Sequence, residues 1–443
     1  MTSEAQFLSA FFEELDRANT TYCVLRNYET LPFSLGGSDL DLLVLANERE
    51  HVADLLVSVA ARYGGRVISE YATTGRYMKL LGCFDGEWWG AAVDLMPGLD
   101  YRGVVYLEAP PVIARSEDFK GIRVASAADA DMIALIKELL NNGRTRKRYL
   151  PNAVAAYREY GKSALEVVRA SFGRSFADEF ERWLGADSQD PTEISSMATR
   201  MRRAVKTEHG AGQRWSALYN FWRRMRRIGF PPGVSIVITG TDGAGKTTVI
   251  DQIIPILSVA VHGKVQREHL RPNWLPQLGV AAGRRKGGEI GPVTEPHKKK
   301  PSGFIGSMLR LAYYWMDYTV GYCIRIVPRI VKRSHICIFD RYFHDIVLDP
   351  RRMRIALPGW ILKCAFAFVP RPKLVICLGA VPEILYQRKP ETSLQEVERQ
   401  VKGLKRLAQR TGSAVWVDTA QPVEDTVNDV LRAIQSSMGN RYQ

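Results

Sequence analysis

The chain has 443 residues, 46% of them apolar, and a formal net charge of +14 at pH 7 from 61 Lys and Arg against 47 Asp and Glu. This length allows two or three domains of ordinary size. The six cysteines form no C-x-x-C pair and no dense cluster, which excludes a disulfide scaffold and favours a reducing, cytoplasmic setting. No stretch reaches the roughly 18 uninterrupted apolar residues of a membrane span, so we expect a soluble protein or one peripheral to the inner face of a membrane. The positive charge favours anionic partners.

The first segment, residues 1–150, alternates strand and helix signals. Residues 1–18 lack the basic and apolar blocks of a signal peptide and predict an amphipathic helix. The predicted strands are 22–25, 39–45, 78–83 and 91–96, and the further predicted helices are 52–62 and 127–140. We therefore expect an α+β domain here.

Two acids at the start of one predicted strand, Asp39 and Asp41, fall on one face because side chains alternate along a strand. A third acid, Asp94, lies in the predicted strand 91–96. Three carboxylates on neighbouring strands can hold Mg²⁺ against a triphosphate. This arrangement resembles the nucleotidyltransferase superfamily, and the resemblance implies that Asp39, Asp41 and Asp94 are metal ligands of a nucleotidyltransferase-like domain.

One pair of residues departs from that superfamily's pattern. Active members usually carry a Gly-Ser or Gly-Gly pair before the paired acids, where this chain has Arg26-Asn27. Bulky side chains at this place obstruct backbone contact with phosphates, whereas Arg26 can supply a cation. An active transferase, a nucleotide-binding remnant and an unrelated domain therefore all stay open.

Residues 151–230 show helical periodicity and predict a basic helical connector. Between residues 200 and 228 the chain has nine Lys or Arg and a single acid, Glu208. Residues 214–227 interleave arginines with an apolar stripe. Such a helix can lie on an anionic membrane or pack on the neighbouring domain, and both interpretations stay open.

The third segment, residues 231–443, begins with the chain breaker Pro231-Pro232-Gly233. Apolar strands predicted at 235–239, 336–339 and 374–378 alternate with helices, which is typical of a parallel sheet wound on both faces. The fold class we expect is therefore α/β, with a doubly wound parallel-sheet domain in the C-terminal half.

The predicted strand 235–239 runs into a glycine-rich loop that satisfies G-x-x-x-x-G-K-[ST] and opens into a helix. Glycines let backbone N–H groups turn inward around phosphates at the positive end of a helix. Lys246 would bring a cation to the β- and γ-phosphates, and the Thr247 hydroxyl can bind Mg²⁺. The residues predicted to bind ATP are Gly240, Asp242, Gly243, Ala244, Gly245, Lys246, Thr247 and Thr248. We therefore expect a P-loop domain with ATP and Mg²⁺ as its cofactors.

The predicted strand 336–339 ends in Asp340-Arg341-Tyr342. Together with Gly-Thr-Asp-Gly-Ala-Gly-Lys-Thr-Thr, this motif resembles thymidylate kinases and the wider nucleoside monophosphate kinase group. The resemblance implies that Asp340 lies near the metal and phosphates, that Arg341 holds the acceptor phosphate and that Asp242 faces the acceptor. It also implies a lid arginine, for which we prefer Arg388 to Lys389 because a guanidinium forks onto phosphate oxygens.

The chain departs from thymidylate kinases in the region that would choose the acceptor. Their Arg-Glu-Pro-Gly-Gly-Thr is here Arg267-Glu-His-Leu-Arg-Pro, and acidic and basic residues follow at 344–352. That longer pattern resembles the thymidylate-kinase-like proteins of bacterial surface-polysaccharide loci. A basic loop at 284–300 either orders over an anionic substrate or has no role.

These observations predict an ATP- and Mg²⁺-dependent phosphotransferase for a small nucleotide or sugar acceptor, preceded by a nucleotide-binding or nucleotidyltransferase-like domain. The alternative is a nucleotide-gated switch whose first domain is inactive and whose basic surfaces dock on a polyanion or a membrane. The combination of Asp340, Arg341 and Arg388 favours the enzyme, because a switch needs no arginine for an acceptor phosphate. Nucleic acid and a second copy of the chain stay open as partners.

Overall fold

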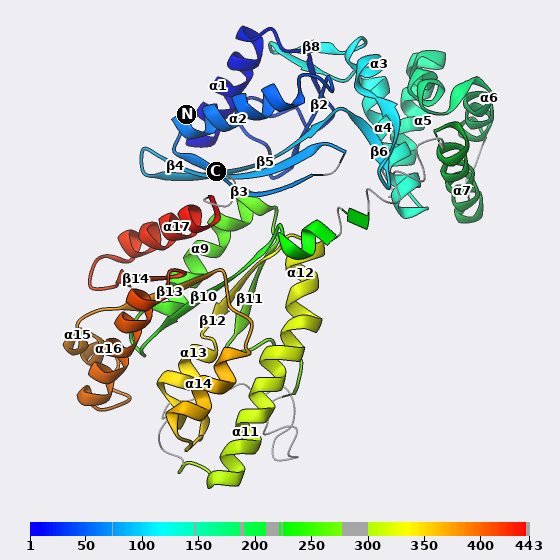
Figure 1. Ribbon diagram of the computed structural model, residues 1–443. Coiled ribbons are helices and arrows are strands. Elements are labelled where there is room, and N and C mark those ends of the chain that lie inside the picture. Colours follow the sequence, from blue (N-terminus) through cyan, green and yellow to red (C-terminus); the bar gives the residue numbers. More distant parts are fainter. Residues whose placement is uncertain are drawn as a thin grey trace. The chain divides into compact units, whose positions relative to one another are not determined.

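The computed structural model describes residues 1–72, 74–145, 148–186, 190–209, 221–222, 225–276 and 300–439. The chain forms two compact units, Met1–Gly229 (unit 1) and Phe230–Gln443 (unit 2) (Figure 1). Each unit has its own central sheet.

A seven-stranded mixed sheet forms the centre of unit 1, in the order β3-β4-β5-β2-β1-β9-β8. Its strands are β1 Tyr22–Val24, β2 Leu40–Val44, β3 Gly65–Ala72, β4 Arg76–Phe84, β5 Glu87–Met96, β8 Glu117–Phe119 and β9 Ile122–Val124. The helices α1 Ser3–Arg17 and α2 Arg49–Arg62 pack on this sheet. The ring of Phe7 in α1 stacks on Trp89 of β5 at 4.3 Å, so the first helix is part of the core.

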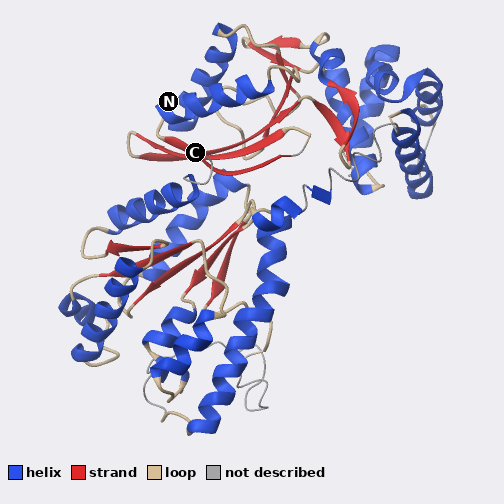
Figure 2. Ribbon diagram, in the orientation of Figure 1, coloured by secondary structure: helices blue, strands red, loops and turns tan. Residues whose placement is uncertain are grey.

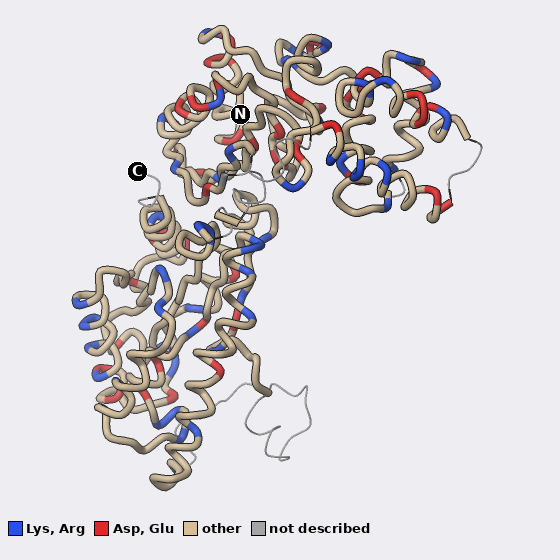
Figure 3. The backbone as a smooth tube through the Cα atoms, turned by 45° about the vertical axis from the view of Figure 1, so that its right-hand side comes forward, with Lys and Arg blue, Asp and Glu red and all other residues tan. Residues whose placement is uncertain are grey.

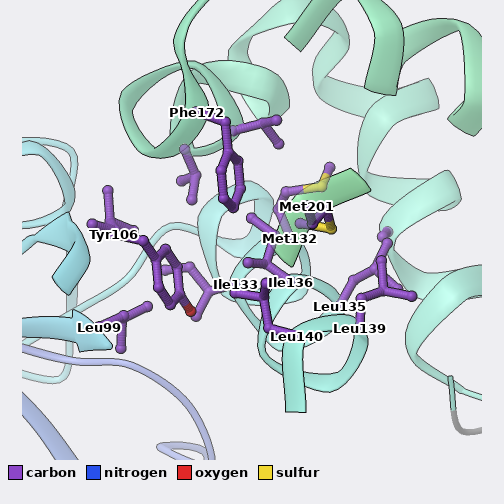
Figure 4. Close-up of a cluster of buried hydrophobic side chains, with 14 of the residues drawn as sticks. Leu99, Tyr106, Met132, Ile133, Leu135, Ile136, Leu139, Leu140, Phe172 and Met201 are labelled. Atoms are coloured by element: carbon purple, nitrogen blue, oxygen red, sulfur yellow. The ribbon is translucent and has the colours of Figure 1, made fainter. Parts of the chain in front are cut away.

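A second layer of unit 1 is helical. It consists of α4 Ala127–Asn142, α5 Tyr149–Tyr160, α6 Glu166–Leu184 and α7 Pro191–Glu208, beside the hairpin β6 Gly98–Tyr101 and β7 Val104–Glu108. Buried residues of α4, among them Met132 and Ile136, share one apolar cluster with Phe172 of α6 and Met201 of α7 (Figure 4). The helices that we predicted as a separate connector therefore share a core with the last helix predicted for the first domain.

Unit 2 is built on a five-stranded sheet in the order β11-β12-β10-β13-β14 (Figure 2). Its strands are β10 Val234–Gly240, β11 Val265–His269, β12 Ile336–Asp340, β13 Leu374–Gly379 and β14 Ala414–Asp418, and all neighbouring pairs are parallel. Every residue of β10, β12 and β13 is buried, because helices cover both faces of the sheet. This is the α/β class that we expected for the C-terminal half.

The helices of unit 2 fall into two groups around this sheet. They are α9 Lys246–Val261, α11 Phe304–Met316, α12 Val327–Lys332, α13 Phe343–Leu348, α14 Gly359–Ala367, α15 Pro382–Arg388, α16 Leu394–Arg410 and α17 Val423–Gly439. α9 packs against α17 and against β10, whereas α11, α14 and α16 contribute to a core with Val237, Phe339 and Val375.

A π-helix, Asp317–Ile326, joins α11 to α12. Its first residue, Asp317, is fully buried and accepts hydrogen bonds from Arg271 at 2.8 Å and from the backbone N–H groups of Trp274 and Leu275. This carboxylate therefore fixes the loop after β11 to the long helix.

Two structural findings concern the cysteines and the possibility of a membrane span. All six cysteines are free thiols. Over the described part of the chain, no helix combines the length and the apolar character needed to cross a bilayer.

Candidate active site

The glycine-rich loop of unit 2 lies between the end of β10 and the start of α9. Gly243 and Gly245 have φ angles of +82° and +74°, a region that favours glycine because it has no Cβ. α9 begins at Lys246, so the first N–H groups of a 16-residue helix face the end of the loop. Gly245, Thr247 and Thr248 are exposed, which leaves this anion-binding end open to a ligand.

The Lys246 side chain folds back over the loop. Its ammonium donates to the carbonyl oxygens of Gly240 at 3.0 Å and Thr241 at 2.7 Å. Burial lowers the pKa of Lys246 to about 7, and Arg341 adds to this effect while Asp242 opposes it. A phosphate group beside this side chain would favour its charged form, which is the property that a phosphate-binding lysine needs.

The strand next to β10 brings Asp340 and Arg341 to the same end of the sheet, since Asp340 pairs with Ile238 in the register of β12 and β10. Asp340 accepts a hydrogen bond from Arg267 at 2.6 Å and lies 3.5 Å from the His269 ring. Burial raises the pKa of Asp340, but the hydrogen bonds from His269 and Arg267 outweigh it, so its pKa lies well below the ordinary value. This carboxylate is therefore ionised and held by Arg267 and His269 of β11.

Arg341 sits in a strained and enclosed position. Its φ of +73° is rare for a residue with a side chain and costs about 1–3 kcal/mol. Its guanidinium donates to Asp242 of the P-loop at 2.5 Å and to Asp345 of α13 at 2.9 Å. Asp345 in turn accepts from Thr239 of β10 at 2.9 Å. The surrounding carboxylates thus keep an arginine beside the P-loop at a cost to the backbone.

A second arginine reaches the same carboxylate. Arg352, from the 3₁₀ helix Pro350–Met353, donates to Asp242 at 2.8 Å. Burial raises the pKa of Asp242, and the positive charges of Arg341 and Arg352 outweigh it, lowering this pKa to about 2. The sequence alone assigns Arg352 no role, because its approach to the P-loop depends on how the chain turns after α13.

The predicted lid arginine also lies near the loop. A Cβ added to Gly243 would stand 2.8 Å from the Leu385 carbonyl oxygen and 3.4 Å from the Cβ of Arg388, so the end of α15 contacts the P-loop. The Arg388 guanidinium donates to the Thr419 carbonyl oxygen at 2.9 Å. The structure therefore brings together the P-loop, Asp340, Arg341 and the backbone of Arg388.

The three carboxylates of unit 1 are brought together at β2 and β5. Asp39 and Asp41 are bonded to protein groups, whereas one carboxylate oxygen of Asp94 is buried without a hydrogen-bond partner among the described residues. Asp41 pairs with Asp94 in the register of β2 and β5. Asp41 accepts a hydrogen bond from Arg26, and Asp39 accepts a hydrogen bond from the Tyr77 hydroxyl at 2.9 Å. Burial raises the pKa of Asp94 to about 7, and Asp41 adds to the rise.

In this arrangement the three carboxylates do not fit a magnesium site, because the Arg26 guanidinium is bonded to the Asp41 oxygen that a metal ion would need. Over the described residues, no group of three His, Cys, Asp or Glu side chains is arranged to hold a metal ion. The metal roles of Asp39, Asp41 and Asp94 stay predictions. In unit 2, Thr247 lies at the exposed start of α9, and Asp340 is bonded to the Arg267 guanidinium, so the metal roles of these two residues also stay predictions.

Several predicted features fall wholly or partly outside the described residues. Almost all of the basic loop at 284–300 lies there, and so does most of the basic helix at 214–227, including Arg223 and Arg224.

Comparison with known proteins finds matches among solved structures. No protein-family model matches the chain, and no curated protein matches it. Among solved structures, it is similar to thymidylate kinase from Ehrlichia chaffeensis, with 14% identity and a TM-score of 0.32, over 46% of this chain and 100% of that one. At this score the likeness carries no argument about function, which has to be drawn from the site itself.

Proposed function

We propose that unit 2 is a phosphotransferase that binds ATP with Mg²⁺ at its P-loop and transfers the γ-phosphoryl group to a small anionic acceptor. The observation that carries the proposal is the convergence of Lys246, Arg341 and Arg352 around the P-loop carboxylate Asp242. A site that only bound nucleotide would not need two further arginines at the far side of the loop.

The residues divide into a donor side and an acceptor side. On the donor side, the glycine loop and the start of α9 bind the phosphates, and Lys246 turns from its two backbone carbonyls onto them. Mg²⁺ held with the triphosphate by Thr247 and Asp340 would neutralise negative charge on the phosphates. Arg388 leaves the Thr419 carbonyl to reach the transferring group, where a cation stabilises the charge that spreads over its oxygens.

On the acceptor side, Arg341 and Arg352 form a doubly cationic edge. An acceptor phosphate or carboxylate would share these guanidinium groups with Asp242, and an acceptor oxygen would then be held in line with the γ-phosphorus. In the transfer, the bond from that oxygen to the γ-phosphorus forms while the bond to the β–γ bridging oxygen breaks, and ADP leaves. The acceptor could be a nucleotide or a sugar phosphate.

The test is a screen of the full-length protein with ATP and Mg²⁺ against nucleoside monophosphates, free sugars and sugar phosphates. ADP release and the phosphorylated product are both measured. We expect release that depends on an anionic acceptor and falls at least about a hundredfold in Lys246→Ala, since one lost cation at such a site costs several kcal/mol. Lys402→Ala, on the exposed side of α16, is the matched control.

ATP binding without any phosphorylated product across the panel would instead favour the nucleotide-gated switch. Turnover that Lys246→Ala leaves unchanged would place the reaction elsewhere in the chain.

A further inference from the structure

Unit 1 contains a pocket that the phosphotransfer reaction does not use. It has a volume of about 320 Å³ and lies between the end of β1, one face of α4 and the start of α5. Its lining residues include Arg26, Lys137, Glu138, Asn141, Asn142 and Tyr149. The α4 members recur at three- and four-residue steps, so a single helix face presents them together.

Two cations stand at the side of this pocket that faces the strand carboxylates. Arg26 is bonded to Asp41, yet its side chain is 41% exposed, so it remains partly accessible to a ligand. Lys137 lies close enough to Asp94 to oppose the rise of that residue's pKa. Cations at this place can hold a phosphate, and an arginine can do so with two parallel hydrogen bonds.

The rest of the lining is mixed, with the apolar Leu25, Ala130, Ile133 and Ala134 beside polar side chains that suit hydroxyl groups. Glu138 accepts hydrogen bonds, and the amides of Asn141 and Asn142 both donate and accept them. The lining contains a single aromatic ring, Tyr149. The volume lies at the lower end of the range of about 300–1,000 Å³ for ligand pockets, which fits one sugar ring with a phosphate better than a nucleoside triphosphate.

We infer that this pocket binds a small phosphorylated sugar without a metal ion, with Arg26 and Lys137 holding the phosphate and the polar face of α4 holding the hydroxyls. Arg26 supplies the positive charge that a metal would bring to Asp41. This site is independent of the phosphotransfer proposed for unit 2, and the ligand is bound whether or not unit 2 holds ATP.

The inference is tested by isothermal titration of the full-length protein with glucose 6-phosphate in EDTA, with glucose and inorganic phosphate as the comparison ligands. The titrations are made in the Lys246→Ala, Arg352→Ala background, which weakens anion binding in unit 2. We expect glucose 6-phosphate to bind at least tenfold more tightly than either comparison ligand, and to bind equally well with Mg²⁺ in place of EDTA.

Two variants of unit 1 assign the binding to the pocket. Lys137→Ala should weaken it at least tenfold, and Ala134→Leu, which fills the pocket from α4 without changing charge, should abolish it. Lys162→Ala, an exposed lysine outside the lining, should leave it unchanged. Urea unfolding of each variant identifies any that fails to fold.

Three results would overturn the inference. They are equal binding of glucose 6-phosphate and inorganic phosphate, binding that requires Mg²⁺, and binding that folded Lys137→Ala and Ala134→Leu both retain. If unit 2 variants lose phosphotransfer but the protein still binds glucose 6-phosphate, the result concerns the phosphotransfer proposed for unit 2 and leaves the inferred pocket in unit 1 unaffected.

Discussion

At the scale of single residues, we expect the charge of Lys246 to depend on whether a triphosphate is bound at the P-loop. Its pKa of about 7 belongs to a side chain bonded only to carbonyl oxygens, with Arg341 nearby. Binding of a triphosphate should raise that pKa, so the protein should take up a proton when ATP binds above pH 7. Titration calorimetry at pH 8 in buffers of different ionisation enthalpy measures this uptake, and Lys246→Ala should remove it. Proton uptake that persists in the variant would assign it to another group.

Arg352 offers a test of the acceptor side with a built-in control. Arg352→Ala removes one of the two cations on Asp242, whereas Arg351→Ala removes an exposed neighbouring charge. We expect Arg352→Ala to raise the KM for the acceptor about tenfold or more and to change the KM for ATP little, since a hydrogen bond between charged groups contributes about 1.5–3 kcal/mol. Steady-state kinetics with each substrate varied measures both constants. If Arg351→Ala raises the KM for the acceptor as much as Arg352→Ala does, Arg352 contributes only surface charge and does not contact the acceptor.

His344 predicts a pH dependence of the stability of unit 2. Burial lowers its pKa to about 4, and its Nδ1 has no hydrogen-bond partner among the described residues. The pKa of His344 in the unfolded chain is about 6.5. Between pH 4 and pH 6.5 this side chain is therefore protonated in the unfolded chain and neutral in the folded chain. The contribution of His344 is complete above pH 6.5 and is lost as the pH falls towards 4, by about 2 kcal/mol at pH 5. Urea unfolding at pH 7 and pH 5 should show this loss for the wild type and not for His344→Phe, and the exposed His51→Gln should behave like the wild type.

At the scale of elements, the loop after β11 depends on one buried carboxylate. Asp317→Ala would leave two backbone N–H groups without their acceptor and would leave the buried Arg271 with the Pro276 carbonyl oxygen but no carboxylate partner. Breaking a buried ion pair from one side costs about 3–5 kcal/mol. Arg432→Ala, in an exposed pair at 3.8 Å, should cost less than about 1 kcal/mol. Chemical denaturation of both variants measures the difference, and similar losses would contradict the anchoring role of Asp317.

The elements that sequence reasoning located are those with strong apolar periodicity. The strands predicted at 235–239, 336–339 and 374–378 appear as β10, β12 and β13, each buried on both faces. β11 was not predicted as a strand, since Val-Gln-Arg-Glu-His is polar and lies at the edge of the sheet. β9 was missed because three residues are too few to show a period.

The same limit applies to the site. The P-loop was recognisable because its residues are contiguous, and Asp340 and Arg341 because they follow a buried strand. Arg352 joins Asp242 across 110 positions, and Arg26 joins Asp41 across 15, so both contacts depend on tertiary packing. The carboxylate pattern in unit 1 was visible in the sequence, but the cation that engages Asp41 shows only in the fold.

At the scale of the whole molecule, positive charge is spread over both units rather than confined to one segment (Figure 3). The net charge of +14 therefore gives a general attraction to anionic surfaces. A specific membrane contact needs apolar anchors as well. Phe221, Trp222 and Met225 at the end of unit 1 are exposed apolar side chains that would serve in such a contact, with exposures of 57%, 65% and 47%.

We therefore predict that the protein sediments with vesicles of anionic lipid at low salt and is released at high salt, since the attraction is screened beyond a Debye length. The arginines that carry it are Arg223, Arg224 and Arg226, because the Arg227 guanidinium already stacks on the Tyr71 ring at 4.9 Å. Each arginine near a charged membrane contributes about 1 kcal/mol, so changing the three to Ser should weaken binding about a hundredfold. The matched control changes three exposed cations of α16, Lys402, Arg406 and Arg410, to Ser, which removes the same charge without apolar neighbours of this kind. Equal weakening by both triple variants would show that net charge alone drives the attraction, and sedimentation that neither salt nor the first variant reduces would exclude these arginines as the contact.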